Sequence, residues 1–85
     1  MQRSVMTTML RLKNIRIGSE YAEADFYPED SQLAGHIVVD ISAGDIASCV
    51  DVPGYGDSYR GHALQRIIKM AQEQDRRTEC CVMWY

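Results

Sequence analysis

Alternating apolar and polar residues dominate the first half of the chain and predict β-strands. In the first such segment the alternation slips by one position at Lys13-Asn14, which indicates a β-bulge. Short turn-forming segments such as Gly18-Ser19 separate the strands, so neighbouring strands should form antiparallel hairpins. The predicted strands are Met9–Ile17, Glu20–Tyr27, Leu33–Ile41 and Asp45–Val52.

A helical period replaces the alternation in the second half of the chain. The helix is expected to begin at Asp57 or Ser58, both good N-cap residues, and to fray near Gln74–Arg77. Its apolar stripe, with three- and four-residue spacing, consists of Leu64, Ile67, Ile68 and Ala71.

The final segment, Cys80–Tyr85, is apolar almost throughout, which is typical of a strand buried on both faces. A right-handed helical crossover would place it parallel to the fourth strand. The expected fold is therefore α+β, a single domain over residues 1–85. It has a mostly antiparallel sheet, in the order β-β-β-β-α-β, with one amphipathic helix packed on one face.

Composition narrows the class of protein. The chain has 85 residues and a formal net charge of −3, and this acidic balance disfavours nucleic acid as a partner. No segment is long and apolar enough for a membrane span, and the polar residues within 1–12 disfavour a signal peptide. Three cysteines without regular spacing argue against a disulfide framework and against a zinc site, which favours a reduced, cytoplasmic protein.

A polar cluster is expected on the sheet face away from the helix. Pairing Ile41 with Ile46 in the last hairpin puts His36 opposite Asp51, and the preceding hairpin puts Glu23 opposite His36. Two interpretations remain open. The residues form cross-strand charge pairs on a solvated face, or a carboxylate-flanked histidine acts as a base or a ligand.

Arg11 would fall near Asp25 on the same face if the bulge in the first strand is real. We assign no catalytic residue, and whether the protein is an enzyme is left open.

A glycine-punctuated turn, Pro53-Gly54-Tyr55-Gly56, joins the fourth strand to the helix. Such a turn directs backbone N–H groups and the start of a helix toward one point, which is how proteins hold phosphates. It is also a common connection in small α+β domains. The candidate ligand-binding residues are Gly56, Tyr59, Arg60, Gly61, His62 and Ala63.

The same region, about residues 33–85, resembles the acyl-CoA-binding core of the GCN5-related N-acetyltransferases. The resemblance rests on the strand end Val50-Asp51-Val52-Pro53, the turn with Tyr59-Arg60-Gly61, the amphipathic helix and the apolar last strand. It implies that acyl-CoA, or another phosphate ligand, binds at Gly56–Ala63. The loop departs from the family pattern, because matching Gly61-His62-Ala63 puts Ser58 where Arg or Gln belongs, and the flanking elements of the family are missing.

The last strand suggests a different activity. It ends in the large aromatic pair Trp84-Tyr85, and at a sheet edge it would offer unpaired backbone groups to a second copy or another protein. The basic residues on and after the helix are interpreted as a solvated face. The favoured function is a non-enzymatic, self-associating or partner-binding module without a cofactor, such as a homodimer. The alternative is a degenerate acetyltransferase-like module that binds acyl-CoA.

Overall fold

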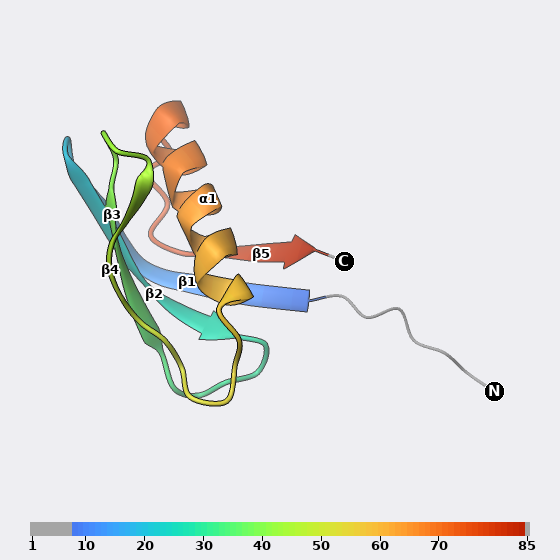
Figure 1. The fold of residues 1–85 in the computed structure, drawn as a ribbon. Coiled ribbons are helices and arrows are strands. Elements are labelled where there is room, and N and C mark those ends of the chain that lie inside the picture. The colour runs from blue at the N-terminus through green and yellow to red at the C-terminus, as the bar shows by residue number, and fades with distance from the viewer. Residues whose placement is uncertain (1–7, 85) are drawn as a thin grey trace.

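The computed structural model describes residues 8–84, so the segment 1–7 and Tyr85 of the expected last strand lie outside the described residues. A five-stranded antiparallel sheet, in the spatial order β4-β3-β2-β1-β5, carries one helix on one face (Figure 1). The expected α+β class and element order are confirmed. The elements are β1 (Thr8–Ile17), β2 (Tyr21–Pro28), β3 (Gly35–Asp40), β4 (Asp45–Val50), α1 (Ser58–Glu73) and β5 (Cys80–Trp84).

The bulge expected in β1 is present. The pairing with β2 shifts register between Lys13 and Arg16, and Asn14 adopts a φ of 54°. This left-handed conformation is one that asparagine tolerates better than most residues. The extra residue brings Ile15 back to the buried face, where the side chains of Leu10 and Leu12 also lie.

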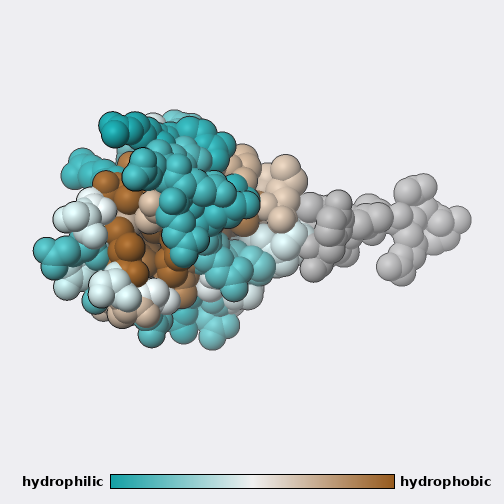
Figure 2. Space-filling model, turned by 90° about the horizontal axis from the view of Figure 1, so that it is seen from above, coloured by the Kyte–Doolittle hydropathy of each residue, from teal (hydrophilic) through white to brown (hydrophobic). Residues whose placement is uncertain are grey.

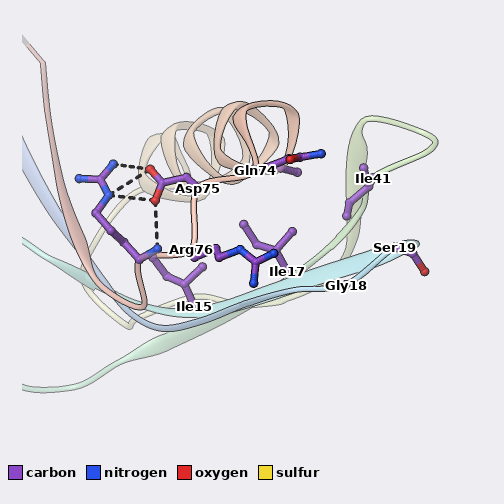
Figure 3. Close-up of a pocket in the computed structure, with 10 residues that line it drawn as sticks. Ile15, Ile17, Gly18, Ser19, Ile41, Gln74, Asp75 and Arg76 are labelled. Atoms are coloured by element: carbon purple, nitrogen blue, oxygen red, sulfur yellow. Dashed lines mark hydrogen bonds and ion pairs between the residues drawn. The ribbon is translucent and has the colours of Figure 1, made fainter.

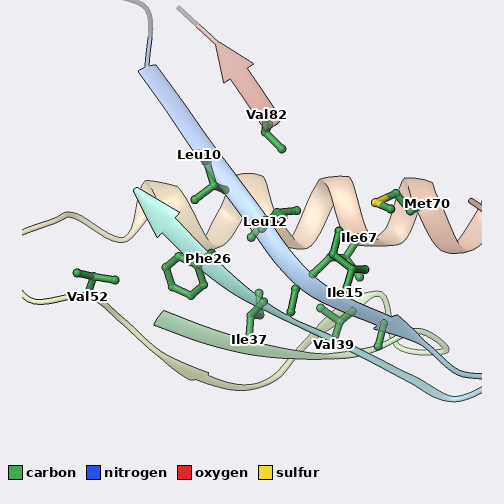
Figure 4. Close-up of a cluster of buried hydrophobic side chains, with 13 residues drawn as sticks. Leu10, Leu12, Ile15, Phe26, Ile37, Val39, Val52, Ile67, Met70 and Val82 are labelled. Atoms are coloured by element: carbon green, nitrogen blue, oxygen red, sulfur yellow. The ribbon is translucent and has the colours of Figure 1, made fainter. Parts of the chain in front are cut away.

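The core lies between α1 and one face of the sheet (Figure 4). Of the stripe predicted for α1, Ile67 is fully buried, whereas Leu64 and Ile68 are only partly buried. Ala63 and Met70, which are not part of the predicted stripe, are buried together with Ile67. The buried stripe is therefore centred about one position earlier than predicted. The buried apolar side chains are Leu10, Leu12, Ile15, Ala22, Ala24, Phe26, Ile37, Val39, Val52, Ala63, Ile67, Met70 and Val82.

The last strand differs from the prediction. β5 runs in the same direction as β4 but lies at the opposite edge of the sheet, where it pairs with β1. It is not buried on both faces, because only Val82 is buried and the side chain of Met83 is 64% exposed. The connection after α1 leads to β1, where the Ile15 N–H donates to the Thr78 carbonyl at 2.9 Å.

Within residues 8–84, α1 is neither long nor apolar enough to cross a membrane.

Candidate functional site

His36 lies on the open face of the sheet between two carboxylates, as expected, but one of the two differs from the prediction. Its Nδ1 is 2.7 Å from Asp25 Oδ1, and its Nε2 is 3.2 Å from Glu23 Oε1. The predicted register is wrong by two positions, because Asp25 stands directly opposite His36 and Glu23 stands opposite Val38. Glu23 therefore reaches His36 diagonally.

Asp51 does not join His36, so this part of the predicted cluster is wrong. The predicted pairing of Ile41 with Ile46 is wrong by two positions, because Ile46 pairs with Val39. A shift of register between Val38 and Val39 then leaves Ala47 without an opposite residue and places His36 opposite Val50. Asp51 lies beyond the end of β4, where its Oδ2 accepts a hydrogen bond from Arg60 at 2.9 Å.

The bulge also turns Cys49 toward the core. Cys49 stands opposite the buried Ile37, and it packs against the buried side chains. Arg11 stands opposite Tyr27, and it is Lys13 that faces Asp25, so the expected neighbour of Asp25 is corrected as well.

The cluster around His36 is a hydrogen-bonded charge network across three strands. Asn14, held at the bulge of β1, donates to Asp25 Oδ2 at 2.9 Å. The hydrogen bond with His36, followed by that from Asn14, lowers the pKa of Asp25 below its usual 3.8. This geometry is typical of cross-strand pairing on a solvated sheet face.

Replacing Asp25 by asparagine should reduce stability at neutral pH, and the difference should disappear in acid. The carboxyl pKa is lower in the folded protein, so the stabilisation is complete above pH 3.8 and is lost as the pH falls through the lower folded-state value. Urea denaturation of both proteins between about pH 7 and about pH 2 measures this. Asp30→Asn, at an exposed turn position, removes the same charge and is the matched control. A difference that persists to the lowest pH would contradict the assignment.

The glycine-rich turn before α1 holds Arg60 against two carboxylates. Arg60 Nη1 is 2.9 Å from Asp51 Oδ2, and its Nη2 is 3.6 Å from Asp57 Oδ2. Asp57 is the N-cap residue but makes no capping hydrogen bond with its side chain. Gly54 adopts a φ of +89°, and Gly56 is exposed. The start of the helix is thus lined by acidic side chains that neutralise its nearest cation.

The other predicted ligand residues lie elsewhere. Ala63 is fully buried in the core, and Gly61 lies within the first turns of α1. Tyr59 donates a hydrogen bond to Glu29 Oε2 at 2.9 Å, and the His62 ring stacks on Trp84 with 3.6 Å between ring centroids.

An aromatic cluster, which the sequence analysis did not identify, joins the start of α1 to the end of β5. It consists of Tyr55, Tyr59, His62 and Trp84, and Tyr59 contacts both Tyr55 and Trp84 edge-on, at 5.8 and 5.7 Å. Desolvation, followed by the hydrogen bond to Glu29, raises the pKa of Tyr59 to about 12. The cluster fixes the last strand to the helix.

A surface hollow lies at the other end of α1. Figure 2 shows an apolar depression ringed by hydrophilic residues, and Figure 3 shows Ile15, Ile17 and Ile41 lining it. Its volume is about 620 Å³. At the rim Arg77 is paired with Asp75 at 2.6 Å, so the isoleucine side chains are bordered by a closed ion pair.

No group of three or more His, Cys, Asp or Glu side chains between residues 8 and 84 is placed to hold a metal ion. A comparison of the chain with protein families, characterised proteins and solved structures finds no match.

Proposed function

We propose that this chain is a non-enzymatic module that binds another protein through the free edge of β5. The observation that carries the proposal is the composition of this edge. β5 contains no charge and no proline, and it pairs with β1 in a continuous register without a bulge. Natural proteins protect exposed strand edges with charges, prolines and bulges. An edge without these features can pair with another strand.

The opposite edge of the sheet is protected. β4 begins at the charged residue Asp45, carries the bulge at Ala47 and is followed by Asp51. Within the described residues, β5 is therefore the more receptive of the two edges.

The β5 edge is also held rigidly, which lowers the entropic cost of binding. Trp84 packs between the rings of His62 and Tyr59, so the end of the strand is fixed to α1 before a partner arrives.

Cys49, Cys80 and Cys81 are free, in keeping with the proposed reducing, cytoplasmic setting.

Cys81 provides a direct readout of this edge. Burial raises the pKa of Cys49 and Cys80, whereas Cys81 is exposed on β5, so a thiol reagent should modify Cys81 first. A bound strand should slow this reaction several-fold. The rate is measured with short extended peptides and over a range of protein concentrations.

A matched pair of variants tests the location. Met83→Lys places a charge on the β5 edge and should abolish the protection of Cys81. Val50→Lys makes the same kind of change on β4, where the side chain is 67% exposed, and should leave the protection intact. A rate at Cys81 that no peptide and no protein concentration alters would contradict the proposal. Thermal stabilisation by acetyl-CoA that is lost in Gly61→Glu would favour the acyl-CoA alternative instead.

A further inference from the structure

Basic side chains border the helix side of the β5 edge. His62, Gln65, Arg66 and Lys69 of α1, together with Val82 of β5, line a shallow hollow of about 170 Å³. His62, Arg66 and Lys69 are separated by four and three residues, so they lie on one face of the helix. Two cations and a histidine thus stand beside the strand edge.

A second hollow, at the start of β5, adds no free positive charge to this border. Arg11 and Lys13 of β1 line it together with Glu79 and Cys81, and its volume is about 170 Å³. An Nη of Arg11 donates to the Ser31 carbonyl at 2.8 Å, but its Nε is buried without a hydrogen-bond partner among the described residues. The cationic groups of Arg11 and Lys13 lie over the ring of Tyr27 in β2, at 5.1 and 5.5 Å from its centre, so both are directed to the side of β1 away from β5.

Arg66 and Lys69 have not been neutralised by the fold. No carboxylate within residues 8–84 forms an ion pair with either of them, whereas Arg60 and Arg77, outside both hollows, are paired. The chain as a whole carries a net charge of −3. The excess of positive charge around β5 is therefore local, and it runs against the overall charge.

We infer that the strand accepted by β5 is an acidic one, an extended segment in which Glu or Asp alternates with apolar residues. Successive side chains of a strand point to opposite sides of the sheet. The acidic side chains would face His62, Arg66 and Lys69, and the apolar ones would lie on the open face beside Met83. The inference rests on the proposed function, because it requires β5 to accept a strand.

Two other partners fit the edge less well. A symmetric pair of β5 strands would bring Arg66 and Lys69 of two copies toward each other, and like charges repel. Nucleic acid would satisfy the cations but has no peptide backbone to pair with the uncharged edge of β5.

The test uses three peptides of about seven residues, long enough to span β5, in which Val alternates with Glu, Gln or Lys. Binding is followed by NMR through the amide signals of residues 80–84 and through the rate of Cys81 modification. The Glu peptide should bind at least about tenfold more tightly than the Gln peptide. Its affinity should fall between 0.1 M and 1 M salt, because the Debye length shortens from about 10 Å to about 3 Å.

A double charge reversal, Arg66→Glu with Lys69→Glu, should remove the preference for the Glu peptide. The matched control is Arg16→Glu with Arg76→Glu, which changes the charge equally outside both hollows and should retain the preference. Gln or Lys peptides that bind as tightly as the Glu peptide would overturn the acidic partner while leaving strand addition intact. No binding by any peptide would overturn both.

Two further probes complete the test. A single-stranded oligonucleotide that binds through Arg66 and Lys69 and is not displaced by the Glu peptide would overturn the inference in favour of nucleic acid. A rate at Cys81 that slows with protein concentration, without any peptide, would overturn it in favour of a second copy.

Discussion

Replacing Gly35 by alanine should destabilise the protein by about 3 kcal/mol, at the upper end of the range for overpacked cores. A Cβ at this position would lie 2.5 Å from the Val50 carbonyl oxygen and closer still to the ring of Phe26. Phe26 stands directly opposite Gly35 in β2 and covers it. The new methyl group must therefore displace either a fully packed ring or the backbone of β4.

Thermal denaturation should show the effect as a decrease in melting temperature of more than about 10 °C, given the size of the domain. Gly61→Ala is the matched control, since a Cβ there meets nothing within 4 Å and the residue lies in α1. That substitution should raise stability by about 0.5–1 kcal/mol, because glycine is a poor helix former. A melting temperature unchanged in Gly35→Ala would show that Phe26 does not cover β3 in this way.

Ile67→Ala should lower the free energy of unfolding by about 3 kcal/mol. Ile67 is fully buried at the centre of α1, and its removal leaves a cavity between the helix and the sheet. For a domain of this size such a loss is a large part of the whole stability. Urea denaturation measures the change directly.

Ile68→Ala is the control for Ile67, with the same chemistry one position further along. Ile68 is only partly buried at the border of the core, so the expected cost is about 1 kcal/mol. Equal losses in the two variants would contradict the orientation of α1. Equal losses would instead agree with the apolar stripe predicted from the sequence, in which Ile67 and Ile68 both face the core.

The bulges show where sequence reasoning succeeds and where it stops. The bulge of β1 was predictable, because strongly apolar residues on both sides of Lys13-Asn14 change phase there. The bulge at Ala47 was not, because the small or half-polar residues around it suit either face of a strand. Asp51 is separated from His36 because Ile46 pairs with Val39 and not with Ile41, and the unpaired Ala47 turns Cys49 inward.

The position of β5 could not be predicted either. The hydrophobicity of residues 80–84 indicates a strand, but the choice between the two edges depends on where the connection after α1 docks, a long-range property. The sequence therefore did not predict which edge of the sheet β5 would occupy or which basic residues would border it. Arg66 and Lys69 border a strand edge only because β5 lies next to β1.

The pairing of β5 with β1 joins two strands that are far apart in the chain. Thr8 of β1 pairs with Trp84 of β5, so on the ribosome this edge of β1 has no neighbour until β5 leaves the exit tunnel. Until then β1 is itself an open edge, with Leu10 and Leu12 beside it, and exposed edges of this kind make nascent chains prone to aggregation. Termination of translation before residue 80 would leave the β1 edge unpaired permanently, so a shortened product would be prone to aggregate through β1.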